Sequence, residues 1–93
     1  MAIYYLHLNN ISHRDLKLDN ILADRSGQGD ISIKVADFGF AEFFDPKELM
    51  LRQCGTRPYM APEIFRNKGY TEKVDIWSLG IITCVLLIGK FPI

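Results

Sequence analysis

Residues 11–20 have the sequence ISHRDLKLDN, a polar stretch with apolar residues threaded through it. Its ten positions hold one histidine, two aspartates, an arginine, a lysine and an asparagine, interrupted by Ile11, Leu16 and Leu18. A surface loop needs polar residues to be solvated, but it does not need apolar residues placed between them. We therefore expect the apolar side chains to anchor the segment, so that its acidic, basic and amide groups converge on one place.

The composition of the chain sets limits on its class. The chain has 93 residues, of which 48% are hydrophobic and 24% are charged, and its formal net charge is zero. This length suffices for one small domain, which buries roughly 60–65% of its unfolded surface. The balanced charge gives no indication of a nucleic-acid or anionic-membrane partner. Cys54 and Cys84 have neither metal-ligand spacing nor a disulfide framework, which favours inert thiols in an intracellular, cytoplasmic protein, with Cys54 accessible in its loop.

No secretory signal or membrane span is expected from the sequence. The first ten residues lack a basic region and contain polar residues too early for a signal peptide. The apolar run at 76–88 has 13 residues, whereas a bilayer requires about 20. A buried core helix is therefore favoured over a small membrane-inserted protein built on residues 76–93.

Hydrophobic periodicity predicts a helix end and a hairpin in the first third of the chain. Residues 2–8 have the pattern of an amphipathic helix that ends at an Asn-Asn pair, and no capping residue precedes that pattern. Residues 20–23 and 31–35 are predicted strands, and the segment DRSGQGD at 24–30 is typical of a turn. The two strands are therefore expected to pair as a hairpin.

The second half is predicted to contain a long loop and two helices. Residues 40–60 show no clear period, which indicates a loop that packs against something larger. Pro62 begins a short helix that ends at Gly69. Thr71 caps a longer helix that runs to about Ile88 and is ended by Gly89. That helix is apolar all round, so we expect core packing on every side, including at its tryptophan.

The hairpin brings two oxygen-bearing side chains to one end. Asn20 stands where the first strand begins and Asp37 follows the second, so antiparallel pairing places them together. Amide and carboxylate oxygens suit Mg²⁺, which takes its remaining ligands from phosphate and water. Asp15 lies in the loop before the hairpin, where a carboxylate can orient a hydroxyl and accept its proton. Lys17 can stabilise the charge of a phosphoryl group in transfer.

Four motifs in this order resemble the catalytic core of eukaryotic protein kinases. They are HRDLKLDN at 13–20, DFG at 37–39, APE at 61–63 and DIWSLG at 75–80. The lysine in DLKLDN and the GT pair at 55–56 resemble the serine/threonine branch rather than the tyrosine branch. The whole chain falls inside the resemblance.

The resemblance implies an α+β fold, a fragment of the kinase C-lobe that is mainly helical, with a short β-hairpin and a long activation loop. It implies that residues 1–93 are a partial protein kinase domain with a catalytic loop at 13–20, an activation segment at 37–63 and helix F at about 71–88. The N-lobe and the C-terminal helices of the family are absent from these 93 residues. They are therefore expected partners if the chain is a fragment.

The resemblance also implies a phosphoryl-transfer site. Asp15 would orient the substrate hydroxyl as the catalytic base, and Lys17 would contact the γ-phosphate of ATP. Thr56 would hydrogen-bond towards both residues and hold the substrate loop. The expected substrate is a protein serine or threonine hydroxyl.

The implied cofactors are ATP and Mg²⁺. Asn20 and Asp37 would bind the metal, and Leu22 would lie under the adenine ring. The implied catalytic residues are Asp15, Lys17, Asn20 and Thr56. The implied cofactor-binding residues are Lys17, Asn20, Leu22 and Asp37.

Other motif residues have implied structural or regulatory roles. His13 and Phe38 would stack in the core, and Asp75 would hold the loop backbone. Arg14 would receive an activating phosphate, and Glu63 would pair with an arginine near the C-terminal end of the domain. The full set is His13, Arg14, Phe38, Gly39, Glu63 and Asp75.

The sequence departs from the family pattern at several places. The 93 residues contain no Gly-rich loop, no strand lysine with its glutamate, no adenine hinge and no arginine partner for Glu63. An unpaired carboxylate in a dry site costs about 3–5 kcal/mol. Between Phe40 and Cys54 there is no Ser, Thr or Tyr, so fixed acids (Glu42, Asp45 or Glu48) would have to face Arg14. Arg57 stands where proline is usual, which alters the expected substrate pocket.

Two functions from different classes follow from these observations. The first is ATP-dependent phosphoryl transfer to serine and threonine hydroxyls of proteins, with little activity expected from the isolated chain. The second is a truncated, non-catalytic kinase-like module that binds protein partners. Marginal folding is expected in either case, with an unfolding midpoint below about 50 °C.

Overall fold

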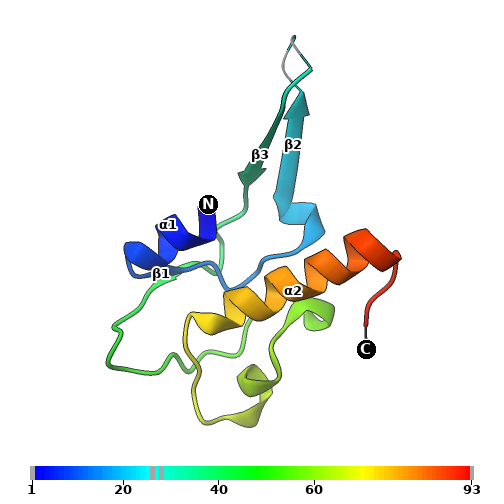
Figure 1. The fold of residues 1–93 in the computed structure, drawn as a ribbon. Coiled ribbons are helices and arrows are strands. Elements are labelled where there is room, and N and C mark those ends of the chain that lie inside the picture. The colour runs from blue at the N-terminus through cyan, green and yellow to red at the C-terminus, as the bar shows by residue number, and fades with distance from the viewer. Residues whose placement is uncertain (1, 26, 28, 93) are drawn as a thin grey trace.

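The computed structural model describes residues 2–25, 27 and 29–92. Within these residues the α-helices are α1 (Ala2–Leu8) and α2 (Lys73–Ile88). The strands are β1 (Ile11–Ser12), β2 (Ile21–Arg25), β3 (Ile31–Val35) and β4 (Glu42–Phe43). Short 3-10 helices cover Leu18–Asn20, Arg57–Tyr59 and Pro62–Arg66. The molecule measures 47 × 31 × 18 Å, with α2 crossing its middle and the β2–β3 hairpin projecting from it (Figure 1).

The predicted hairpin is confirmed. β2 and β3 pair antiparallel, with Ile21 opposite Val35 and Arg25 opposite Ile31. The first strand begins one residue later than predicted, because Leu18–Asn20 form a 3-10 turn, and it extends further, to Arg25. The predicted turn includes residues 26 and 28, which lie outside the described residues.

The helix end at the start of the chain is also confirmed. α1 ends at Leu8, and Asn10 then takes a left-handed φ of 59°. The Asn9 side-chain amide donates to the Tyr5 carbonyl at 2.8 Å, which satisfies one of the last helical carbonyls.

The long helix ends as predicted and begins slightly later. Gly89 has a φ of 84°, and its N–H donates to the Val85 carbonyl at 2.8 Å, which closes α2 at Ile88. The capping residue is Glu72 rather than Thr71, but the Thr71 hydroxyl still accepts from the Lys73 N–H at 3.3 Å.

The short helix predicted for residues 62–69 is only a 3-10 helix, Pro62–Arg66. The chain then turns through left-handed Asn67 and through Gly69, whose φ is 87°. A Cβ at Gly69 would stand 2.7 Å from the Leu49 Cβ, so this close approach requires glycine.

Residues 40–60 contain more structure than the sequence predicted. β4 pairs with β1, placing Ile11 opposite Phe43, and an isolated bridge joins Met50 to Tyr70. Two-residue strands show no detectable period, which explains why the pattern predicted only a loop. The β1–β4 pairing fastens the loop to the segment that precedes Asp15, and the bridge fastens it to the residue that precedes Thr71.

Two apolar clusters lie against α2. One contains Ile3, Leu16, Tyr59, Ile81 and Ile82, and the other contains Ala61, Ile64, Tyr70 and Val74. Leu16 is fully buried, while Ile11 and Leu18 are half-buried. The apolar residues of the opening stretch therefore anchor it as expected.

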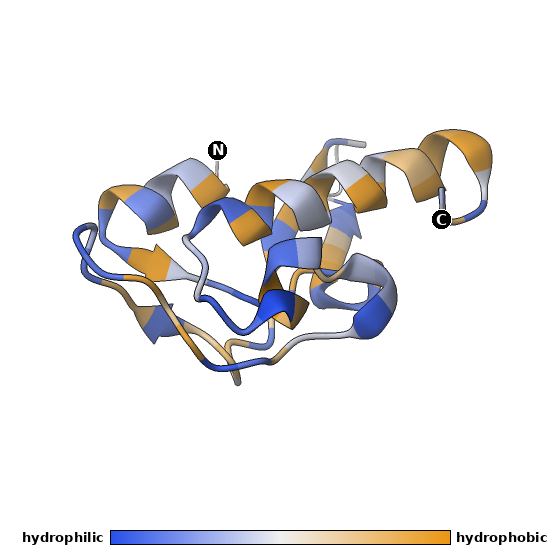
Figure 2. Cartoon of the chain, turned by 90° about the horizontal axis from the view of Figure 1, so that it is seen from below, coloured by the Kyte–Doolittle hydropathy of each residue, from blue (hydrophilic) through white to orange (hydrophobic). Residues whose placement is uncertain are grey.

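Two fold expectations are wrong. Most of the described residues lie outside the two α-helices, of 7 and 16 residues, so the α+β chain is not mainly helical. α2 is not enclosed on every side, since Ile76 and Trp77 are exposed and Leu87 is 81% exposed. Figure 2 shows apolar residues continuing to the C-terminal end of α2. Among the described residues, no helix combines the length and apolar character needed to cross a bilayer.

Candidate functional site

Asp15, Lys17 and Thr56 form one hydrogen-bonded cluster. The Thr56 hydroxyl donates to Asp15 Oδ1 at 2.7 Å, and the Lys17 ammonium donates to Thr56 Oγ1 at 3.1 Å. Asp15 is 8% exposed, and the fully buried Leu16 follows it in the chain. A carboxylate and an ammonium thus share one hydroxyl, although 39 residues separate Lys17 from Thr56.

Asn20 and Asp37 lie at the base of the β2–β3 hairpin. The Ala36 N–H donates to the Asn20 carbonyl at 2.8 Å, which extends the β2–β3 hydrogen-bond pattern by one residue pair. Asp37 therefore follows directly after the residue that is bonded to Asn20. The Asn20 side-chain NH₂ donates to the Asp15 carbonyl at 2.8 Å, so its amide oxygen remains available as a ligand. Asp37 is exposed, and its Oδ1 accepts from the Gly39 N–H at 3.2 Å.

This donor set fits Mg²⁺ held partly by phosphate. Mg²⁺ in nucleotide sites binds one or two protein carboxylates and keeps water and phosphate as its other ligands. Asn20 and Asp37 supply two hard oxygen donors and no sulfur or imidazole. Within the described ranges, no group of three His, Cys, Asp or Glu residues is arranged to hold a metal alone. The pair is therefore suited to a metal that arrives with a phosphate ligand.

A buried carboxylate on α2 holds the backbone that precedes Asp15. Asp75 is fully buried and accepts from the His13 N–H and the Arg14 N–H, each at 2.9 Å. It also accepts from the Ser12 hydroxyl at 3.1 Å and lies 2.8 Å from His7 Nε2. Four donors from two segments thus converge on one side chain.

The backbone is strained at two positions around the cluster. Arg14 has a φ of 66° and Asp37 a φ of 55°, in the left-handed region that few residues other than glycine adopt. Such positions persist only where surrounding contacts impose them, and they cluster at functional sites. At Arg14 the Asp75 carboxylate provides that constraint.

His13 is buried, and its tautomer follows from its two contacts. The Asp15 N–H donates to His13 Nδ1 at 3.2 Å, so the proton is on Nε2, which donates to the Ala36 carbonyl at 3.0 Å. The imidazole meets the Phe38 ring edge-on at 4.9 Å. Phe38 itself is 47% exposed, so the expectation that both rings lie in the core is wrong for Phe38. Its outer face has no covering segment among the described residues.

Arg14 is buried and has three polar partners. Its Nε donates to the Phe40 carbonyl at 2.8 Å, and its Nη1 donates to the Tyr70 hydroxyl at 3.1 Å. Its Nη2 lies 3.6 Å from the carboxylate of Glu42, the one of the three expected fixed acids that pairs with it among the described residues. Glu42 is more than half exposed, so this ion pair is weak.

The remaining predicted residues lie as follows. Leu22 is 53% exposed on β2. Glu63 is half-buried rather than buried, so water relieves the predicted cost of its unpaired carboxylate; no ion pair to it is found among the described residues. Cys54 is buried, contrary to the expectation of an accessible thiol, because its sulfur packs 3.8 Å from the Tyr70 hydroxyl.

Three residues of this region were missed by the sequence analysis: His7, Ser12 and Tyr70. Each is polar and reaches its partner across 56 to 68 residues of sequence, so no local pattern indicates its role. The only sequence signal for these roles was that His7 and Tyr70 are polar aromatic residues, and that signal is not specific.

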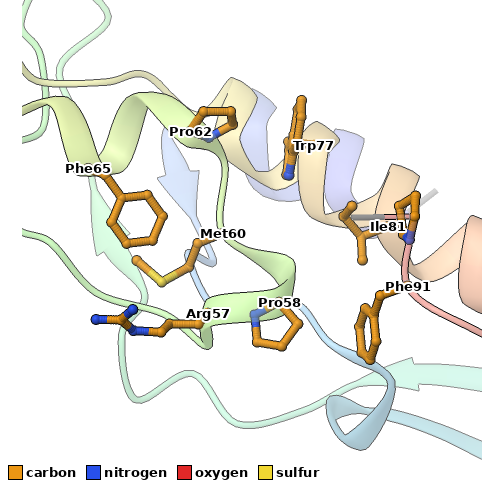
Figure 3. A pocket seen from close by; sticks show the side chains of 9 residues that line it. Arg57, Pro58, Met60, Pro62, Phe65, Trp77, Ile81 and Phe91 are labelled. Carbon is orange, nitrogen blue, oxygen red and sulfur yellow. The ribbon is translucent and has the colours of Figure 1, made fainter.

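An apolar cavity of about 490 Å³ opens between α2 and the residues that follow Thr56 in the chain. Its lining includes Pro58, Met60, Phe65, Trp77 and Phe91 (Figure 3). Arg57 is the charged residue among the described lining residues, and its guanidinium extends away from Pro58 and Phe91 (Figure 3). Trp77 lines this cavity instead of a closed core, which corrects the expectation for that residue.

Comparison with known proteins identifies the family. Residues 1–93 match the family model described as protein kinase domain. The chain is 47% identical over 92 residues to the serine/threonine-protein kinase SIK3 homolog of Danio rerio, covering 98% of this chain and 7% of that protein. It is 45% identical over 93 residues to calcium/calmodulin-dependent protein kinase type I of Schizosaccharomyces pombe, covering 98% and 28% respectively. The chain therefore spans less than a third of these relatives, and by this match it belongs to the protein kinase domain family.

Proposed function

We propose that this chain carries the catalytic and metal-binding residues of a serine/threonine protein kinase. The reaction is transfer of the γ-phosphoryl group of ATP to a serine or threonine hydroxyl of a protein. The observation that carries the proposal is the Thr56 hydroxyl, which links Asp15 to Lys17. The proteins similar to this chain include serine/threonine-protein kinases, which supports a serine or threonine hydroxyl as the phosphoryl acceptor.

Asp15 acts on the substrate hydroxyl in this proposal. Thr56 occupies Asp15 Oδ1 and thereby leaves Oδ2 for the incoming hydroxyl, whose proton the carboxylate accepts. Lys17 is held by the same Thr56 hydroxyl and stabilises the negative charge that develops on the phosphoryl oxygens. Thr56 thus sets the distance between the two charged groups.

Asn20 and Asp37 hold the metal in this proposal, and Leu22 offers an exposed apolar surface on β2 for the adenine ring. When bound, Mg²⁺ neutralises charge on the phosphates. The Asn20 amide is oriented by its bond to the Asp15 carbonyl, so the acid-base group and the metal ligand are mechanically linked. Displacement of either one is expected to disturb the other.

The domain assignment is part of the proposal. Residues 13–20 are the catalytic loop, residues 37–63 the activation segment and α2 the helix F of a kinase C-lobe. Support comes from the two bonds that Asp75 accepts from the His13 and Arg14 N–H groups, which join α2 to the catalytic loop, and from the β1–β4 pairing, which fastens residues 42–43 to the strand before that loop.

The test places the chain in a complete kinase. Residues 1–93 replace the aligned segment of the fission yeast calcium/calmodulin-dependent kinase, because the 93 residues contain no Gly-rich loop or strand lysine and we expect little turnover from them alone. The chimera is expected to transfer phosphate from ATP to a serine peptide, not to the matched tyrosine peptide. Asp37→Asn is expected to raise the Mg²⁺ concentration required for half-maximal activity.

The second candidate function is a non-catalytic kinase-like module that binds protein partners. The open apolar cavity lined by Pro58, Trp77 and Phe91 favours it, because contiguous exposed apolar surface often marks an interaction site. The same chimera separates the two candidates. A chimera with the melting temperature of its parent and no phosphoryl transfer would favour the binding module over the enzyme.

A further inference from the structure

The hydroxyl of Tyr70 lies at the centre of a buried polar group of atoms. It accepts from Arg14 Nη1 at 3.1 Å, donates to the Arg52 carbonyl and contacts the Cys54 sulfur at 3.8 Å. A phenol has one donor and two acceptor sites, so the thiol is the donor in the third contact and all three sites are used. Tyr70 is 3% exposed, so no water competes for them.

The backbone of Tyr70 is paired with the same segment. Its N–H donates to the Met50 carbonyl at 2.9 Å, and its carbonyl accepts from the Met50 N–H at 2.8 Å. Residues 50, 52 and 54 therefore all contact one residue. Tyr70 is also linked to the catalytic loop, because its hydroxyl accepts from Arg14, the residue before Asp15.

The segment from Phe40 to Cys54 contains no Ser, Thr or Tyr, so it offers no hydroxyl for phosphorylation. The fixed acid nearest to Arg14, Glu42, is a weak substitute at 3.6 Å with its carboxylate in water. Arg52 adds a positive charge nearby, but its guanidinium lies over the Phe40 ring at 5.0 Å. The Arg14 side chain donates to two uncharged partners, the Phe40 carbonyl and the Tyr70 hydroxyl. Of these two, the Tyr70 hydroxyl is the one that belongs to a side chain.

We propose that the Tyr70 hydroxyl is a positioning group that fastens residues 50–54 to Arg14 and so orders the segment 41–53 without covalent modification. This inference deepens the proposed function, because it concerns the regulation of the same site. The phenol stays protonated at neutral pH and keeps its donor role, since burial raises its pKa above the ordinary value against the opposing effect of Arg14.

The test is hydrogen–deuterium exchange of the unmodified 93-residue chain, read by mass spectrometry. Tyr70→Phe keeps the ring and the backbone bridge and removes the hydroxyl. Exchange in peptides covering 41–53 is expected to rise about tenfold, the factor that corresponds to about 1.4 kcal/mol for a lost buried hydrogen bond. Exchange in peptides covering α2 is expected to stay unchanged.

Two matched variants isolate the hydroxyl. Tyr4→Phe removes the phenol of a 63% exposed tyrosine and is expected to change exchange nowhere. Glu42→Gln removes the charge partner of Arg14 and is expected to raise exchange in 41–53 less than twofold. Exchange measurement requires no catalysis, so the inference can hold or fail independently of the kinase activity.

Several outcomes would overturn the inference. Unchanged exchange of 41–53 in Tyr70→Phe, or a larger rise in Glu42→Gln than in Tyr70→Phe, would contradict it. If Tyr70→Phe unfolds the whole chain, Arg14→Lys tests the bond from its other side, because it replaces the two separate nitrogens that serve the Phe40 carbonyl and the Tyr70 hydroxyl with a single ammonium group. No selective rise in 41–53 for Arg14→Lys would then reject the proposal.

Discussion

The start and the last turn of α2 lie in opposite surroundings. The start places Val74, Asp75 and Ser78 inside the molecule, and the last turn exposes Leu86 and Leu87 by 68% and 81%. Charge and hydropathy alone would give the reverse order. The polar groups at the start are buried because they are paired, as in the Ser78 hydroxyl that donates to the Tyr59 carbonyl at 2.7 Å.

The comparison shows what sets burial along this helix. The start of α2 faces three segments, residues 12–14, the 3-10 helix at 57–59 and the bridge at Tyr70, and each supplies hydrogen-bond partners or apolar contacts. The last turn of α2 extends past them, as Figure 1 shows, and its Leu86 and Leu87 are exposed. Burial therefore follows the segments that reach the helix, not the composition of the helix.

The largest effect is expected at the most buried carboxylate. Asp75→Ala leaves four donors without their acceptor and is expected to lower the free energy of unfolding by about 3–5 kcal/mol. Urea unfolding followed by circular dichroism measures it. Asp30→Ala, at an exposed aspartate, is expected to stay within about 0.5 kcal/mol. Equal effects of the two substitutions would show that the start of α2 is not held by Asp75 as described.

A matched pair on one helix sharpens the same comparison. Ile81→Ala, at a 5% exposed residue, is expected to lower the free energy of unfolding by about 2–5 kcal/mol. Leu87→Ala removes a side chain of similar size from the exposed last turn and is expected to change the free energy of unfolding by less than about 0.5 kcal/mol. A large loss for Leu87→Ala in the same urea experiment would mean that a packing partner covers the last turn in solution.

The smallest effect is the pH dependence of the Tyr70 region, which precedes α2. Burial raises the pKa of the Tyr70 phenol in the folded chain, so the folded state holds its proton more tightly than the unfolded state. The resulting stabilisation is full below the unfolded pKa of about 10 and is lost as pH rises through the folded pKa, by at most about 1.4 kcal/mol per pH unit. Tyr70→Phe is expected to flatten this decline in urea midpoints measured from pH 9 to 11. If the urea midpoint of Tyr70→Phe declined with pH as steeply as that of the unaltered chain, the decline would not come from the Tyr70 phenol.

Local pattern was sufficient for the elements with strong periodicity or end signals. The β2–β3 hairpin, the end of α1 and the Gly89 end of α2 follow from alternation, Asn pairs and glycine chemistry. The same pattern placed Asn20 beside Asp37, because antiparallel pairing fixes which residues meet at the hairpin base. These features require no information about contacts between distant segments.

The features that the sequence analysis missed depend on contacts between distant segments. Tyr70 meets Arg14 across 56 residues and His7 meets Asp75 across 68, and neither pairing leaves a local trace. The exposure of Trp77 was also mispredicted, because an all-round apolar pattern shows what a helix can bury and not what reaches it. The expectation that Phe38 lies in the core came from the family resemblance, and in this structure its ring is 47% exposed.

The central claim is that Asp15 acts directly in phosphoryl transfer, and one measurement tests it most directly. In the kinase chimera, Asp15→Asn and Asp19→Asn make the same change in one loop, at a buried and an exposed aspartate respectively. We expect Asp15→Asn to lower kcat by about 10²- to 10⁴-fold with little change in melting temperature, and Asp19→Asn to leave kcat within about twofold. Equal kcat in the two variants, in chimeras that melt alike, would contradict the account.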